Sequence, residues 1–291
     1  MTQKIALRIH VGTLAGARHG VPLLVERLQA HLAGATFLLC LGPDQSGRAF
    51  GQAMRLRRHC GWKTPLRGTL IPAGEIAPKA ADSLRLIEAA GFEAGISAWN
   101  RVAWEKQAAS ADNDWIANDL KQAMDAFERL YGHPPQVFGA PDWQASRHQL
   151  RLLQRLGFAC ASDCRGSHPF LPVWQGELLP CPQLPTTLPT LEELMHGGRQ
   201  EEEAVQRLLE LTENLQAPQV FSLRAEHEGL GHLGALEQLW QGWQDQGHLL
   251  TSLGDLAADL EPKTLPYAEI RPGDIPNRNG SLFLQGRDHL A

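Results

Sequence analysis

Short runs of aliphatic and β-branched residues alternate along this chain with stretches whose apolar residues recur at helical spacing. The first run covers residues 5–11 and ends at Gly12, and residues 21–32 follow with an apolar side chain every three or four positions. A second apolar run at 35–41 stops at a glycine–proline pair that begins with Gly42. A strand, a helix and a strand in this order favour parallel pairing of the two strands. The pattern therefore predicts an α/β fold built on a parallel sheet.

The same alternation continues to residue 260 without a break that resembles a linker. It predicts one (β/α) barrel that occupies residues 1–291, rather than two domains. Residues 261–291 are rich in proline, glycine and asparagine, so we expect mostly loop there, with at most a small strand at 281–284. Strands are expected at residues 5–11, 35–41, 92–98, 136–139, 158–162, 218–223 and 248–251, and, within a proline-rich stretch, near 178–179.

Charge and composition exclude several classes of protein. The formal net charge of −5 gives no indication of a nucleic-acid partner. Residues 1–4 lack the apolar run of a signal peptide, and no stretch approaches the ~18 apolar residues of a membrane span, so we expect a cytoplasmic protein. The five cysteines show no repeated pattern and predict reduced thiols. Cys160 and Cys164 are separated by three residues, and no second pair completes a zinc site.

One segment departs from the acidic balance of the chain. Between Gly47 and Thr69 there are six basic residues and no acidic one, interspersed with apolar side chains. Such a segment suits contact with an anionic membrane surface or with a phosphorylated ligand. It equally suits a solvated surface loop that contains a short helix. The sequence leaves both interpretations open.

In a parallel α/β barrel, reactive side chains lie where each strand ends and its loop begins. At the first such exit, His10 is either a hydrogen-bonded structural group or a catalytic base. Asp142 and Glu226 are either an acid–base pair or the salt-bridge partners of Arg165 and Arg224. The candidate site residues at the expected strand exits are His10, Gly12, Ser97, Arg101, Asp142, Asp163, Arg165, Arg224, Glu226 and Glu228.

The sequence contains no complete motif for a bound metal or cofactor. His227 and His232 stand five residues apart beside Glu228, whereas a zinc-binding helix needs histidines four apart. Gly229 and Gly231 further disfavour a helix at this place. A nucleophile elbow, a P-loop and a dinucleotide-binding glycine motif are also missing. We therefore expect no metal ion and no other cofactor.

Six segments nevertheless form a recognisable series, at residues 7–13, 20–22, 42–44, 162–166, 184–193 and 225–229. They include Asp-Cys-Arg-Gly at 163–166 and Thr-Leu-Pro-Thr at 187–190. In this order they resemble the polysaccharide deacetylase (NodB-homology) family, and the likeness extends over residues 4–260. The resemblance implies a distorted (β/α)7 barrel and metal-dependent hydrolysis of an N-acyl sugar. It also implies an aspartate base and a metal ion held by one aspartate and two histidines.

The chain departs from this family at the positions that carry its chemistry. Where the family has an Asp-x-Asp pair after the first strand, the chain has His10 and Gly12, so the metal-binding aspartate is replaced by a residue without a side chain. The two metal-binding histidines correspond to Ser97 and Arg101. The histidine after the seventh strand corresponds to Arg224. An arginine of the fourth motif corresponds to Gln144.

These departures predict a non-catalytic family member that has lost the divalent metal, in which Arg101 and Arg224 attract an anion. Its expected partner is a phosphorylated or undecaprenyl-linked sugar, or another protein, at the cytoplasmic face of the inner membrane. The alternative is an active carbohydrate de-N-acylase that hydrolyses an amide C–N bond with His10 as base. General acid–base catalysis alone supplies only ~10²–10⁴-fold, which favours the first interpretation. A third interpretation, a structural or interaction protein, requires a closed pocket.

Overall fold

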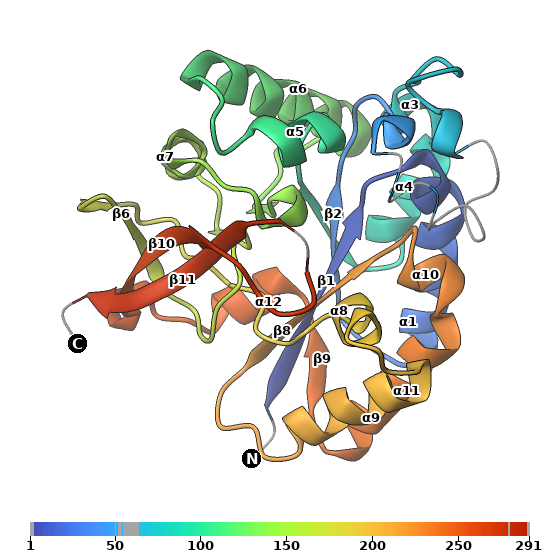
Figure 1. Ribbon diagram of the computed structural model, residues 1–291, viewed down its shortest axis with the longest axis vertical. Helices are drawn as coiled ribbons and strands as arrows, with labels where there is room; N and C mark the ends of the chain where they lie inside the picture. The colour runs from blue at the N-terminus through green and yellow to red at the C-terminus, as the bar shows by residue number, and fades with distance from the viewer. Residues whose placement is uncertain (1–2, 50, 52–53, 55–63, 279, 290–291) are drawn as a thin grey trace.

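The computed structural model describes residues 3–49, 51, 54, 64–278 and 280–289. Its centre is a curled parallel sheet of seven strands in the order β5-β4-β3-β2-β1-β8, with β9 also paired to β1 (Figure 1). β2 pairs with the second half of β1, and β9 pairs with its first residues. The seven strands expected for this sheet are confirmed as β1 (Lys4–Val11), β2 (Thr36–Leu39), β3 (Glu93–Ile96), β4 (Val137–Phe138), β5 (Cys160–Ala161), β8 (Gln219–Arg224) and β9 (Leu249–Thr251).

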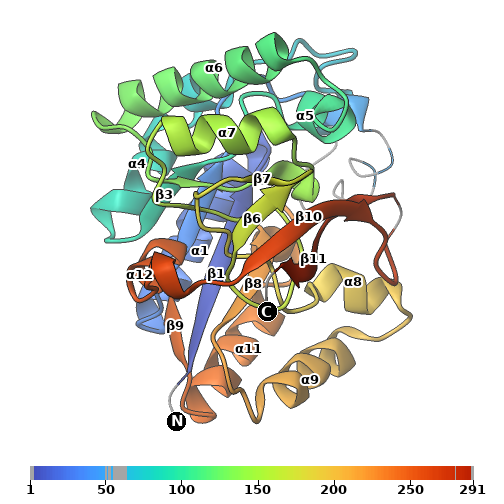
Figure 2. The same ribbon diagram turned by 90° about the vertical axis from the view of Figure 1, so that its left-hand side faces the viewer.

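Helices lie around this sheet (Figures 1 and 2), and the longer ones, such as α6 (Asn113–Tyr131), bury one apolar stripe. This helix, the longest, begins where the Asp112 side chain accepts the Trp115 N–H. It ends at Gly132, whose φ of 82° is left-handed. The other helices are η1 (Gly16–Gly20), α1 (Val21–Ala30), α3 (Ile76–Lys79), α4 (Ala81–Ala89), α5 (Arg101–Gln107), α7 (Arg147–Arg155), α8 (Leu191–His196), α9 (Glu201–Thr212), α10 (Glu228–Gly231), α11 (Leu233–Asp245) and α12 (Leu253–Ala258), with short 3₁₀ turns η2 (Ser46–Arg48), η3 (Thr64–Leu66), η4 (Pro141–Trp143) and η5 (Pro262–Thr264).

A second sheet of four strands flanks the first, in the order β11-β10-β6-β7 (Figure 2). The expectation that residues 261–291 form mostly loop is wrong, because β10 (Tyr267–Gly273) and β11 (Leu282–His289) pair there as an antiparallel hairpin. Ala268 and Ile270 of β10 and Phe283 of β11 are buried in a separate apolar cluster. This buried face stabilises the hairpin despite its prolines and glycines. The remaining strands are β6 (Leu171–Trp174) and β7 (Glu177–Leu178).

The expectation that no helix forms beside His227 is also wrong, because α10 begins at the next residue. Gly229 fits this turn because a Cβ there would approach Cδ1 of Leu24 to 2.9 Å. The close packing of α10 against Leu24 of α1 favours a residue without a side chain here, despite the low helix propensity of glycine.

Part of the basic segment between Gly47 and Thr69 lies outside the described residues, namely 50, 52, 53 and 55–63. The described ends are anchored to the fold: Nε of Arg48 donates to the Gly68 carbonyl at 3.1 Å, and Nε of Arg67 lies 3.6 Å from Oδ2 of Asp44. Contact of this segment with a membrane or a phosphate therefore stays a prediction. Within the described ranges, no helix combines the length and the apolar character that crossing a membrane requires.

Candidate functional site

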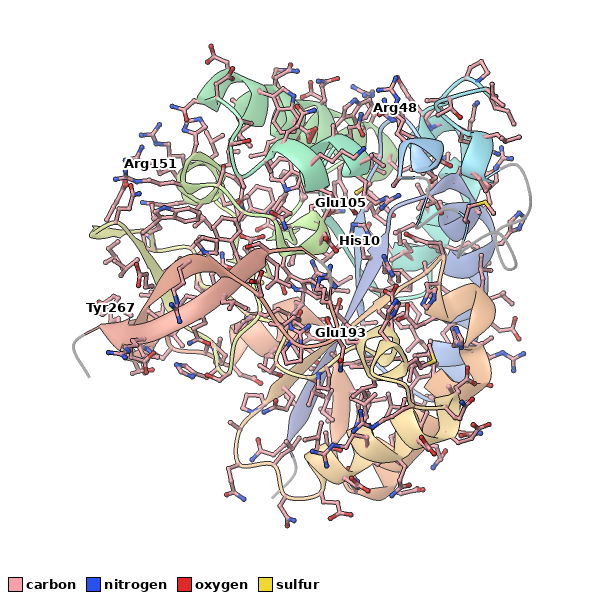
Figure 3. All side chains as sticks on the ribbon, in the orientation of Figure 1. His10, Arg48, Glu105, Arg151, Glu193 and Tyr267 are labelled. Carbon is pink, nitrogen blue, oxygen red and sulfur yellow. The ribbon has the colours of Figure 1, made fainter. Side chains whose placement is uncertain are left out.

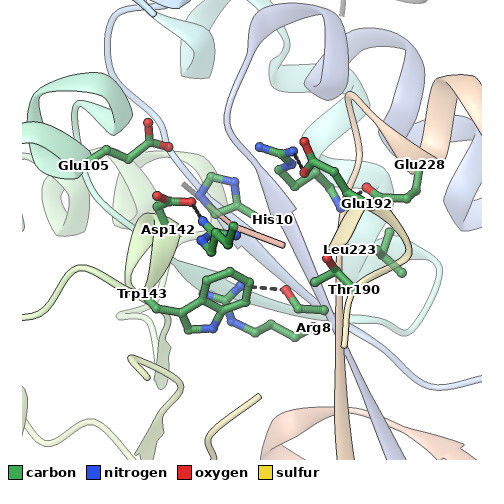
Figure 4. A pocket seen from close by; sticks show the side chains of 12 residues that line it. Arg8, His10, Glu105, Asp142, Trp143, Thr190, Glu192, Leu223 and Glu228 are labelled. Atoms are coloured by element: carbon green, nitrogen blue, oxygen red, sulfur yellow. Dashed lines mark hydrogen bonds and ion pairs between the residues drawn. The ribbon is translucent and has the colours of Figure 1, made fainter. Parts of the chain in front are cut away.

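A small cavity of about 30 Å³ lies where β1 and β8 end, at the rim where we expected the site. This volume has room for roughly two water molecules. Four of the candidate residues line it: His10, Asp142, Arg224 and Glu228. Figure 4 labels His10, Asp142 and Glu228, and Figure 3 shows where His10 lies in the whole molecule. The other lining residues are Arg8, Glu105, Trp143, Thr190, Glu192, Ser222, Leu223 and Arg278.

Arg101, the first residue of α5, extends its side chain across Gly12. A Cβ built on Gly12 would overlap Cδ of Arg101 and lie 2.8 Å from Cε1 of His10. Nε of Arg101 donates to the Gly12 carbonyl at 3.2 Å, and Nη1 donates to Oε1 of Glu105 at 2.8 Å. The missing side chain at Gly12 therefore makes room for the arginine, which brings its own positive charge to the end of β1.

His10 lies on the wall of the cavity but is only 4% exposed. Its Nε2 is 3.6 Å from Sγ of Cys40, whose pKa burial raises to about 12, so the thiol is neutral. Burial and three nearby guanidiniums lower the pKa of His10 well below 6.5. The three belong to Arg8, Arg101 and Arg224. His10 is therefore a neutral imidazole at pH 7, and a weak base.

The carboxylates around Arg224 keep this arginine charged. Burial would lower the pKa of Arg224, but Glu192 and Glu228 raise it above its ordinary value. Arg224 forms an ion pair with Glu192, and its backbone N–H donates to Oε2 of Glu228 at 2.9 Å. Burial opposes the charged form of Glu228, yet His227 and Arg224 bring its pKa to about 2. Arg224 thus already has partners of opposite charge within the fold.

Glu226 lies behind the cavity and accepts the backbone N–H of Gly12 at 3.2 Å. Burial raises its pKa, while Arg101 and Arg224 lower it by a smaller amount. Among the described contacts, no hydrogen bond joins Glu226 to Asp142. Asp142 instead forms an ion pair with Arg278. The candidate acid–base pair is therefore split between two ion-pair clusters.

Three further candidates form hydrogen bonds that hold parts of the fold together. Oγ of Ser97 donates to the Gly139 carbonyl at 2.6 Å, which joins the ends of two strands. Asp163 accepts the Ala140 N–H at 3.0 Å, and burial raises its pKa to about 6. Arg165 donates to both oxygens of a buried glutamate, Glu193, at 2.6 and 2.8 Å. None of the three lines the cavity.

Arg8 and Arg278 belong to the site, although the sequence analysis did not select them. Arg8 interrupts the apolar run of β1. A charged residue within a buried run is costly, so its presence indicates a structural or functional role. Arg278 lies in the loop between β10 and β11, where no local pattern marks it. Both guanidiniums, with that of Arg165, lie 4.8 to 5.4 Å from the ring centroid of Trp143. Such distances are typical of cation–π contacts.

Comparison with known proteins places the chain in a family. A protein of Shewanella sediminis named "Probable 4-deoxy-4-formamido-L-arabinose-phosphoundecaprenol deformylase ArnD" is 31% identical over 97% of this chain and 94% of its own length. The chain belongs to the polysaccharide deacetylase (NodB-homology) family, in its ArnD-like branch. No protein-family model matches it.

Solved structures of the family share the fold. A structure from Mycobacterium smegmatis described as a polysaccharide deacetylase has a TM-score of 0.66 at 15% identity, over 94% of this chain and 96% of its own. A CE4 family pseudoenzyme from Bacillus anthracis has a TM-score of 0.55 at 12% identity, over 88% of this chain and 66% of its own. These likenesses confirm the expected (β/α)7 barrel.

The residues that the resemblance assigns to the family's metal positions, Gly12, Ser97 and Arg101, do not suit a divalent ion. Zinc in a catalytic site takes about three protein ligands with nitrogen, sulfur or carboxylate donors. Gly12 has no donor, Ser97 is hydrogen-bonded to Gly139, and Arg101 places a permanent cation at the site. No group of three histidine, cysteine, aspartate or glutamate side chains suited to a metal occurs among the described residues. We therefore derive no chemical step through a metal ion.

Proposed function

We propose that this chain is a non-catalytic member of the ArnD-like branch, whose strand-exit pocket recognises an anionic sugar ligand. The observation that carries the proposal is the position of Arg101 across Gly12, where its guanidinium supplies the positive charge that the family takes from a metal ion. Arginine cannot lower the pKa of a bound water as a divalent ion does. The site therefore lacks a source of hydroxide, and His10 is too weak a base to replace it.

The ligand that we propose is a phosphorylated or undecaprenyl-linked sugar. The name of the Shewanella relative specifies a sugar attached through phosphate to undecaprenol. Four arginines at or beside the cavity, Arg8, Arg101, Arg224 and Arg278, suit such an anion. A lipid-linked ligand would also place the protein at the cytoplasmic face of the inner membrane, with the basic segment between Gly47 and Thr69 near its surface.

Metal content tests the proposal directly. We expect wild-type protein, purified without chelator and analysed by inductively coupled plasma mass spectrometry, to contain far less than one zinc, cobalt or nickel per chain. We also expect no formate release from an N-formyl aminosugar linked to phosphoundecaprenol. About one metal ion per chain, or metal-dependent formate release, would overturn the proposal.

A variant with the family's ligands supplies the matched control. The triple substitution Gly12→Asp, Ser97→His and Arg101→His restores three donors and removes the arginine stem that overlaps a side chain at position 12. We expect it to bind about one zinc per chain, whereas Gly12→Asp alone does not. Circular dichroism of each variant separates loss of metal binding from loss of fold.

The competing proposal is an active de-N-acylase with His10 as base. It is supported by the position of His10 and Asp142 on the wall of one cavity. It predicts release of formate or acetate in the presence of EDTA, and loss of that release in His10→Gln. Absence of any EDTA-resistant hydrolysis by the wild-type protein would eliminate it.

A further inference from the structure

Arg8 differs from the other arginines at the pocket because it has no carboxylate partner within ion-pair distance among the described residues. It is 2% exposed. Nη1 donates to Oγ of Ser222 at 2.9 Å, and Nη2 donates to the carbonyl of Ala140 at 2.8 Å and, more weakly, to that of Ser162. Its Nε has no hydrogen-bond partner in the described structure. The nearest compensating charge is the buried carboxylate of Asp163, which raises the pKa of Arg8 but lies beyond ion-pair distance. A buried guanidinium with an unused donor can therefore still gain from an anionic ligand.

Arg278 reaches the same pocket from the opposite side. The loop between β10 and β11 is largely exposed, but the Arg278 side chain is only 16% exposed because it turns inward. There it forms an ion pair with Asp142, and its Nη1 lies 3.5 Å from Oε1 of Glu193. The carbonyl of Ser281 anchors the loop by accepting a hydrogen bond from Nε2 of Gln144 at 2.7 Å. Arg278 thus lines the same cavity as Arg8.

The indole of Trp143 lies between these two arginines. The guanidinium carbon of Arg8 is 5.4 Å from its ring centroid, and that of Arg278 is 4.8 Å away. Burial lowers the pKa of each arginine to about 10, so both are charged at pH 7. Trp143 keeps its orientation because its Nε1 donates to Oγ1 of Thr186 at 3.0 Å. Two charged guanidiniums therefore lie next to one fixed aromatic ring on the wall of the pocket.

We propose that Arg8 and Arg278 form a phosphate subsite beside Trp143, and that Arg278 leaves Asp142 to bind the incoming phosphate. Arg278 lines the cavity, and on binding phosphate it would exchange one anion for another without loss of its charge partner. Asp142 acts in this scheme as a competitor for the Arg278 guanidinium. The assignment rests on the proposed anionic sugar ligand and specifies which residues bind its phosphate.

Guanidinium forks match the oxygens of a phosphate, and charge-assisted hydrogen bonds of this kind are about twice as strong as neutral ones. A phosphate group can reach the subsite as a free ion or as part of a sugar phosphate. We therefore use inorganic phosphate and glucose 1-phosphate as probes, and glucose as the neutral comparison. Isothermal titration calorimetry at constant ionic strength measures all three.

We expect saturable phosphate binding by the wild-type protein and none for glucose. Arg278→Ala should weaken phosphate binding at least tenfold. Asp142→Asn should strengthen it several-fold, because asparagine fits the φ of 55° at this position but no longer competes as an anion for Arg278. Arg271→Ala removes an exposed arginine from the same hairpin and should leave the affinity unchanged. Tighter binding of glucose 1-phosphate than of phosphate would identify a sugar phosphate as the ligand.

Two results would overturn the subsite: no saturable phosphate binding at millimolar concentrations, or equal affinity in wild type, Arg278→Ala and Asp142→Asn. Because removal of the buried Arg8 can unfold the chain, Arg8→Lys is the variant of choice. It keeps the charge but loses the fork, and we expect about tenfold weaker phosphate binding with an unchanged circular dichroism spectrum. Metal content and formate release are measured separately, so failure of the subsite is distinguishable from failure of the non-catalytic assignment.

Discussion

The contact between Gly12 and Arg101 can be tested by a double-mutant cycle. Gly12→Ala places a methyl group where Cδ of Arg101 lies, and overpacking of this kind costs about 1–3 kcal/mol of unfolding free energy. The backbone at Gly12 is not in the left-handed region, so alanine adds no conformational strain. Arg101→Ala removes the partner of Glu105, and loss of one member of a buried pair costs about 3 kcal/mol or more.

In the Arg101→Ala background, the methyl group at position 12 no longer meets the arginine stem. It still lies 2.8 Å from Cε1 of His10, so part of the overpacking remains. We therefore expect Gly12→Ala to destabilise this background by about 1–2 kcal/mol less than it destabilises the wild type. Urea unfolding of the four proteins, followed by both tryptophan fluorescence and circular dichroism, measures the difference and checks two-state behaviour. Additive effects within about 0.5 kcal/mol would refute the position of Arg101.

Two further predictions concern buried charge. The pKa of His10 is lower in the folded chain than its unfolded value of 6.5. Below pH 6.5 the unfolded chain therefore binds more protons than the folded chain, and the free energy of unfolding decreases as pH falls. Relative to His10→Gln, the wild type should lose up to about 1.4 kcal/mol per pH unit below pH 6.5 in urea titrations, and a flat difference contradicts this. Arg165→Met should destabilise the chain by about 3 kcal/mol because it removes the closer cation from the buried Glu193 and leaves only Arg278, at 3.5 Å. Arg151→Ala breaks a more exposed ion pair with Glu177 and should destabilise the chain far less. Similar losses of stability in both variants would contradict the role of burial.

The central sheet could be predicted from sequence because its strands are buried on both faces. Such strands appear as continuous apolar runs, and β1 and β2 follow this rule. The second sheet could not be predicted in the same way. β10 pairs with β6, almost one hundred residues earlier, and both strands contain a proline. A local pattern does not reveal that a distant strand covers its apolar face.

The location of the site followed from topology, since parallel strands bring their ends to one rim. His10, Asp142, Arg224 and Glu228 line the cavity at this rim, and their role as a functional site stays a prediction. The resemblance of six short segments to one family also led to the correct fold. These inferences depend on strand order and residue identity, which the linear pattern of the chain contains.

The charge partners inside the site depend on packing. Glu105 could have been chosen for Arg101, because the two residues are four apart on one helix. Glu192 reaches Arg224 from α8, and Arg278 reaches Asp142 from a loop more than one hundred residues later. Such ion pairs form only when distant elements meet at the right depth and angle. Residue identities thus indicated a site rich in arginine, whereas three-dimensional packing determined that most of these arginines form ion pairs and that Arg8 has no carboxylate within ion-pair distance among the described residues.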